Sequence, residues 1–169
     1  MTRSTYLMEL AARKTLVIDG PMGTMIQQLG LEKEAFSLSP LLEGFEGQRY
    51  APGCNDLLSI SRPEVIYDIH RAYIAAGADI IETNTFGANR FSLEEYGLAE
   101  QVYDLNLAAV EVARMAVEEA EREDESRFVF IAGVVGPTGK SASFSPSVDD
   151  PAQRDADFQI GRASCRERV

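Results

Sequence analysis

The chain has 169 residues, of which 45% are hydrophobic and 25% are charged, a composition that excludes disordered and collagen-like chains. Its formal net charge of -11 argues against nucleic acid and anionic membrane as partners, because both need a basic surface. No apolar run is long enough to span a bilayer, the first residues lack a secretion signal, and two cysteines are too few for a disulfide framework. We therefore expect a cytoplasmic protein with a small-molecule partner.

Short apolar runs alternate with segments of helical period after an N-terminal extension over residues 1–13. In chain order, the predicted elements are a strand over 14–19, a helix over 22–29, a loop over 32–55, a helix over 63–76, a strand over 79–83, a helical turn over 92–96, a helix over 100–123 and a strand over 128–134. This order favours parallel strands joined by helical crossovers, which is the α/β class.

Two helices carry signals beyond their period. For the helix over 63–76 we predict Ser61 as the N-cap, proline in the first turn and Gly77 at the end. The long helix ends in a charged run over 118–125, which predicts a solvated face.

The last residues, 160–169, differ in character from the rest of the chain. They read IGRASCRERV, with three arginines and one glutamate in an otherwise acidic sequence, and they resemble the translation of a sequencing adapter. We interpret them as a non-native tail, with an ordinary basic tail as the alternative. On this interpretation the natural sequence is interrupted near Gln159, and the chain is a fragment.

Polar and glycine clusters follow all three predicted strands. Asp19 and Gly20 end the first, ETNTFG (82–87) the second, and GVVGPTG (133–139) the third. Ligands bind at the carboxyl ends of parallel strands, so these clusters predict one small-molecule site. The glycines and asparagines suit ordinary turns equally well. Asp19 carries more weight, because a carboxylate at the end of a buried strand must find donors or a cation.

Two other kinds of site fit the residues poorly. GVVGPTGKS (133–141) is similar to a phosphate-binding P-loop, but its spacing is wrong by one residue and Pro137 lacks the N–H that a phosphate needs, so a nucleotide binder is the weakest alternative. His70 is the single histidine and is expected to be a packing residue, and Cys54 has no partner thiol. The sequence therefore indicates no metal ligands and no Cys–His nucleophile.

Six motifs point to one family. They are LVIDGPMGTM (16–25), GCNDLL (53–58), RPEVI (62–66), DIHRAY (68–73), AGADIIETNTFG (76–87) and GPT (136–138). In this order they resemble the homocysteine S-methyltransferase family over residues 14–159. The NDLL and ETNTFG motifs are most similar to the homocysteine-binding module of its cobalamin-dependent methionine synthase branch.

The resemblance implies a TIM (β/α)₈ barrel, of which this chain holds the first three βα units. It also implies a zinc ion held by three cysteines of later strands, beyond Gln159. In the methionine synthase branch, methylcobalamin and methyltetrahydrofolate belong to downstream modules. The expected partners are therefore homocysteine, the rest of the barrel and those modules, and the fragment itself is expected to be inactive.

By resemblance, the chain holds the amino-acid end of the site and no catalytic residue. Asp19 pairs with the substrate ammonium, and the Gly20 loop, Thr83, Asn84 and Phe86 line the pocket. Pro21 departs from the family pattern of Ala or Gly and removes one backbone N–H, which leaves the N–H of Met22 as a donor.

Three alternatives remain open at this point. The first is a stand-alone homocysteine methyltransferase that uses betaine or S-methylmethionine. The second is a non-catalytic amino-acid-binding module. The third is another barrel enzyme such as an aldolase, for which the positions of Lys14 and Lys140 offer little support. Because part of a barrel leaves sheet edges open, we expect the isolated chain to aggregate.

Overall fold

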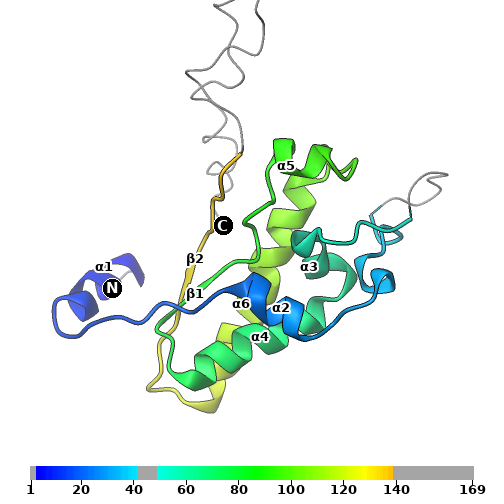
Figure 1. Ribbon diagram of the computed structural model, residues 1–169. Helices are drawn as coiled ribbons and strands as arrows, with labels where there is room; N and C mark the ends of the chain where they lie inside the picture. The colour runs from blue at the N-terminus through cyan, green and yellow to red at the C-terminus, as the bar shows by residue number, and fades with distance from the viewer. Residues whose placement is uncertain (1–2, 42–48, 139–169) are drawn as a thin grey trace, which may run out of the picture.

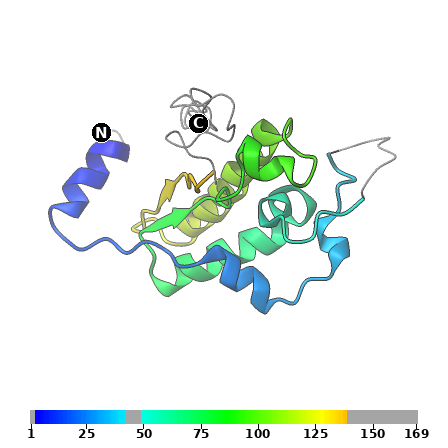
Figure 2. The ribbon, with the colours of Figure 1, turned by 45° about the horizontal axis from the view of Figure 1, so that its top comes forward.

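The fold is described from a computed structural model over residues 3–41 and 49–138 (Figure 1). In chain order the elements are α1 (Arg3–Ala11), α2 (Met22–Gln28), the 3-10 helices η1 (Lys33–Phe36) and η2 (Asn55–Leu57), α3 (Leu58–Ser61), α4 (Pro63–Ala76), β1 (Ile80–Glu82), α5 (Arg90–Glu94), α6 (Val102–Glu123) and β2 (Phe130–Ala132). Helices α4 and α6 pack against each other and against the two strands (Figure 2). Within these ranges, no helix has the length and apolar character that crossing a bilayer requires.

The sheet is small and parallel, which confirms the predicted α/β class. β1 pairs with β2 in a register that places Ile81 opposite Ile131. The predicted first strand contributes a single parallel bridge, Ile18 to Ile80, supported by the Asp19 N–H that donates to the Ile80 carbonyl at 2.9 Å. The prediction of a full strand over 14–19 is wrong, because among the described residues this segment pairs through one bridge only, and Val17 and Ile18 stay 53% and 50% exposed.

Helix α4 begins and ends through different kinds of signal. Its C-cap is Gly77 with φ of 109°, as predicted, and Pro63 is its first residue. The predicted N-cap is wrong, because Ser61 is the last residue of α3 and Arg62 precedes the helix without a side-chain cap. The Ser61 hydroxyl instead donates to the Ala35 carbonyl at 2.7 Å, so a tertiary contact uses the group that a cap would need.

Helix α6 carries apolar residues at three- and four-residue spacing, Val102, Leu105, Ala109, Val112 and Ala116, and this period predicts one buried face. Val102 is partly buried. Leu105, Ala109, Val112 and Ala116 are all at most 5% exposed. The charged end of the helix is largely solvated, as predicted, although Glu121 pairs with Arg3 at 3.0 Å. The residues that α6 buries include Ala109, Ala113, Ala116 and Ala120, so small side chains make up much of its buried face.

The segment over 32–55 is more ordered than a loop in its described part. It contains η1 and an antiparallel bridge from Ser37 to Tyr50. Phe36, Leu38 and Ala51 are buried in the same cluster as the helices. The segment is therefore mostly irregular, as predicted, but its backbone buries apolar side chains that no regular period in the sequence marks.

The N-terminal extension forms helix α1, for which the sequence analysis predicted no element. Tyr6 packs edge-on against Phe128 at a centroid distance of 4.8 Å, and the Arg3 guanidinium lies 4.6 Å from the centroid of the same ring. The predicted tail over 160–169 and the end of the P-loop-like motif lie outside the described residues.

Candidate functional site

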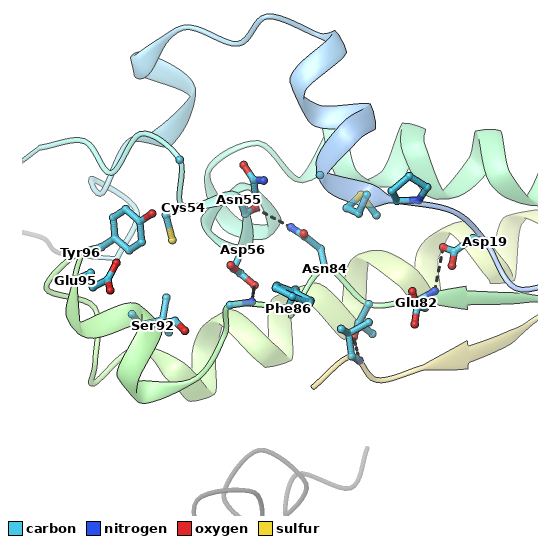
Figure 3. Close-up of a pocket in the computed structure, with 18 of the residues that line it drawn as sticks. Asp19, Cys54, Asn55, Asp56, Glu82, Asn84, Phe86, Ser92, Glu95 and Tyr96 are labelled. Atoms are coloured by element: carbon cyan, nitrogen blue, oxygen red, sulfur yellow. Dashed lines mark hydrogen bonds between the residues drawn. The ribbon is translucent and has the colours of Figure 1, made fainter. Parts of the chain in front are cut away.

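A cavity of about 730 Å³ opens at the carboxyl ends of β1 and β2. All six residues that the sequence analysis assigned to substrate binding line it: Asp19, Gly20, Met22, Thr83, Asn84 and Phe86. Figure 3 shows Asp19 and Glu82 at one end of the cavity and Cys54, Ser92, Glu95 and Tyr96 at the other, with Asp56, Asn84 and Phe86 between them. Parallel strands bring these side chains together because their carboxyl ends meet at one edge.

Asp19 is a half-satisfied carboxylate. Its Oδ2 accepts the backbone N–H of Glu82 at 3.0 Å, whereas its buried Oδ1 has no hydrogen-bond partner among the described residues. Burial raises the pKa of Asp19 from 3.8 to about 6, the Glu82 N–H opposes this shift, and the Glu82 charge adds to it. The site therefore holds an acid that is short of a donor or a cation.

The loop after Asp19 lies directly on α4. A Cβ at Gly20 would come within 2.9 Å of the Tyr73 hydroxyl oxygen, so any side chain there would displace the tyrosine. Burial raises the pKa of Tyr73, and the Asp19 charge contributes to the rise. Pro21 and Met22 follow on the cavity wall, and α2 begins at Met22.

Thr83 belongs to a hydroxyl chain that joins the two strand ends. The Thr85 hydroxyl donates to the Val134 carbonyl at 2.8 Å, so the Thr83 hydroxyl is the donor in its 2.7 Å bond to Thr85. The Val134 N–H donates to the Thr83 oxygen at 3.1 Å. Because the Thr83 hydroxyl already donates its proton to Thr85, it can accept a hydrogen bond from a ligand but cannot donate one.

Asn84 and Asp56 tie the loop after β1 to the segment that contains η2. The Asn84 amide donates to the Asn55 carbonyl at 2.8 Å and to the Ser59 hydroxyl at 3.2 Å. In return, Asp56 Oδ1 accepts the Gly87 N–H at 2.8 Å. No role for Asp56 was predicted from the sequence. The one local sign of a role is that this charged residue directly precedes a Leu-Leu pair that is buried.

Phe86 lies at the rim of the cavity with 64% of its surface exposed. Its backbone approaches the end of the third strand so closely that a Cβ at Gly136 would lie 2.0 Å from the Phe86 carbonyl oxygen. Only glycine fits at Gly136 without moving the loop.

Neither Cys54 nor His70 is a reactive group. Cys54 lines the cavity but is 2% exposed, and burial raises its pKa to about 11, so its thiol is protonated at neutral pH. His70 is fully buried on α4, away from the cavity lining, and neither ring nitrogen has a hydrogen-bond partner in the described chain. Burial lowers its pKa to about 4. This environment agrees with a packing role.

A model of the homocysteine S-methyltransferase family matches residues 16–168. The chain belongs to this family. The crystal structure of the oxidized form of the homocysteine methyltransferase MmuM from Escherichia coli is similar to this chain, with 26% sequence identity and a TM-score of 0.60. The match covers 77% of this chain and 40% of that one. The metallated form of MmuM is 25% identical with a TM-score of 0.58, and the match covers 83% of this chain and 47% of that one. The chain thus spans less than half the length of these MmuM structures.

The zinc that the family resemblance implies has no ligand set here. Within residues 3–41 and 49–138, no group of three or more His, Cys, Asp or Glu side chains is placed to hold a metal ion. Cys54 is also a poor thiolate ligand because of its raised pKa. The described residues therefore do not fit a zinc site.

Proposed function

We propose that the chain is the homocysteine-binding part of a methyltransferase that moves a methyl group to the sulfur of homocysteine and so produces methionine. Asp19 carries the proposal. In a member of this family, its Oδ1 lies buried beside the cavity without a hydrogen-bond partner in the described chain. The ammonium group of an amino acid would bring both the N–H donors and the charge that this oxygen lacks.

The charge of this end of the cavity suits a cation. Asp19 has a pKa of about 6 and is mostly ionised at neutral pH, and Glu82 lies beside it. A bound ammonium would lower the Asp19 pKa again, because an opposite charge favours the ionised form. The contacts at this end of the cavity would orient the substrate for the reaction.

The other contacts follow from the chemistry of the lining. Gly20 and Met22 carry backbone N–H groups and Pro21 carries none, so we assign the substrate carboxylate to the N–H groups of Gly20 and Met22. Thr83 can only accept a further hydrogen bond, which suits the ammonium rather than the carboxylate. The exposed ring of Phe86 is placed to cover the methylene groups.

The reaction itself is a nucleophilic substitution. A lone pair of the homocysteine sulfur forms the new bond to the methyl carbon, and the bond from that carbon to the methyl donor breaks. A free thiol has a pKa of about 8.5, so the sulfur must lose its proton first. We assign this step to parts of a longer protein beyond this chain.

We further propose that the described elements are the first three βα units of a (β/α)₈ barrel in a longer protein, called the full-length protein below. The parallel order of the strands, the shared edge of the polar side chains and the 40% and 47% coverage of the MmuM structures support this. The NDLL and ETNTFG motifs favour the methionine synthase branch, with methylcobalamin as donor. The similarity to MmuM supports a second candidate, a homocysteine methyltransferase that uses a different methyl donor.

The test compares homocysteine with 4-mercaptobutanoate, which has the same thiol and carboxylate but no amine. In the full-length protein, Asp19→Ala should lower kcat/KM for homocysteine about 100-fold, about 2.7 kcal/mol, and should leave turnover of the analogue within about threefold. Equal losses for both substrates would overturn the ammonium-binding role. Turnover with methylcobalamin, betaine or S-methylmethionine in separate assays then separates the two candidates.

A further inference from the structure

Two segments far apart in the sequence hold each other at the middle of the cavity wall. From the loop after β1, the Asn84 side chain donates to the Asn55 carbonyl. From η2, the Asp56 side chain accepts the Gly87 N–H. Each segment therefore supplies one side chain and one backbone group, and the two hydrogen bonds cross the same boundary in opposite directions (Figure 3).

The fit between Asp56 and Gly87 is close. A Cβ at Gly87 would lie 2.6 Å from Asp56 Oδ2, so a side chain at this position would push the carboxylate away. Asp56 is 8% exposed, and burial raises its pKa, whereas the N–H groups of Gly87 and Ala88 lower it. The backbone donors thus partly offset the loss of water around the carboxyl group.

The opposite side of the same loop is also held. The Thr85 hydroxyl donates to the Val134 carbonyl, and the Phe86 backbone lies against Gly136. The loop over 83–87 is therefore fixed on one side by the segment after β2 and on the other by the segment that contains η2. Phe86 projects from this fixed backbone and remains 64% exposed at the rim.

We propose that Asp56 is a positioning residue for substrate binding: through the Gly87 N–H, it holds the loop over 83–87 in the shape that lines the cavity. In this proposal Asp56, although it lines the cavity, acts through the loop and not through a contact with the substrate. The enzymatic readout rests on the proposed function, because it assumes that homocysteine binds against this loop. A structural role alone would change the free energy of unfolding without changing the KM of the folded protein.

The first experiment replaces Asp56 with Asn, which keeps the volume, removes the charge and leaves one acceptor oxygen in place of two. In the full-length protein, Asp56→Asn should raise the KM for homocysteine about tenfold, about 1.4 kcal/mol, and leave kcat within about twofold. The matched control is Asp124→Asn. Asp124 is an exposed acid that does not line the cavity, and it accepts the Ser126 N–H in a hydrogen bond of 3.0 Å. This variant should leave KM unchanged. A folded Asp56→Asn variant with the KM of the wild type would overturn the proposal.

A double-mutant cycle guards against simple loss of structure. Gly87→Ala should raise KM when Asp56 is present and should raise it much less in an Asp56→Ala background, because the clash partner is gone. Additive effects of the two changes would count against the proposal.

Amide hydrogen exchange gives a readout that is independent of turnover. The Gly87 amide should exchange about tenfold faster in Asp56→Asn than in Asp124→Asn. If wild-type protein neither binds nor turns over homocysteine, the proposed function fails, whereas the exchange experiment still decides whether Asp56 holds the loop. Equal Gly87 exchange in the two variants would show that it does not.

Discussion

The two buried aspartates of the cavity differ in how their lost water is replaced. Asp56 meets backbone N–H groups from the loop after β1, and the protein itself satisfies its carboxylate. Asp19 accepts one N–H, from Glu82, and keeps one buried oxygen without a partner in the described chain. The difference teaches that a buried acid with no orphaned oxygen can hold backbone in place, whereas an acid with an unpaired buried oxygen on a cavity marks where the charge of a ligand belongs.

His70 is a third case that sharpens this comparison. It is as buried as Asp56 and has even fewer partners than Asp19, because neither ring nitrogen is hydrogen-bonded within the described ranges. It does not line the cavity, so no ligand can compensate for its burial. An unpaired buried group therefore indicates a site only where a cavity reaches it.

The largest effect on stability is expected at His70 in acid. Burial lowers the pKa of His70 from 6.5 to about 4. The unfolded chain therefore binds a proton at His70 below pH 6.5, whereas the folded protein binds it only near pH 4. The contribution of His70 is complete above pH 6.5 and falls by about 3 kcal/mol as the pH drops to about 4. His70→Leu should remove this loss, as measured by urea unfolding of the full-length protein at pH 7, 5.5 and 4.5. The same acid sensitivity in the variant would show that His70 does not cause it.

Removing the Asp56 carboxylate should have the next largest effect. Asp56→Ala leaves the part-buried Gly87 N–H without its acceptor, which costs about 1 to 2 kcal/mol of unfolding free energy. Urea unfolding at pH 7 checks this value, with Asp56→Asn as the variant that keeps the volume and should lose less. Unchanged stability in Asp56→Ala would mean that the Gly87 N–H finds another acceptor.

Asp19→Asn should change stability in the opposite direction. The folded pKa of Asp19, about 6, lies above the ordinary value of 3.8, so the folded state binds the proton more tightly and stability falls as the pH rises through 6. Because Asp19 is half-buried, solvent screens the penalty, and we expect the variant to be about 1 kcal/mol more stable at pH 7. The gain should vanish below pH 3.8, where the carboxyl is protonated in both states. A loss of stability at pH 7 would place Asp19 with Asp56 as a fully satisfied acid.

The smallest effect is expected at the exposed acid used as a control. Asp124 accepts hydrogen bonds from both the N–H and the hydroxyl of Ser126 in a solvated turn after α6. Asp124→Asn should therefore change neither the urea midpoint nor the KM for homocysteine. A clear shift in either would show that the comparison between the buried acids does not depend on burial.

The cavity end around Asp19 could be predicted because its residues follow strands. Polar residues directly after apolar runs are visible in the sequence, and parallel pairing brings them to one edge. Asp56 could not be found in this way, because it lies in an irregular segment where neither helix nor strand period exists. The error at Ser61 has a related cause: its local sequence matches a helix cap, but a contact with Ala35 uses the hydroxyl.

The sequence by itself determined the α/β class, the span and buried face of α6, the end of α4 at Gly77 and six of the residues that share the cavity. The helices depend on local period and glycine conformation, which act over a few residues, and the six cavity residues could be placed because parallel strands bring their carboxyl ends to one edge. Only the tertiary structure decided how short the strand pairing is, that residues 32–41 and 49–55 help to build the core, and which buried acid is satisfied. Those properties depend on which backbone groups meet across long stretches of chain, and hydrogen bonds of that kind, such as Asp56 to Gly87, leave no periodic trace in the sequence.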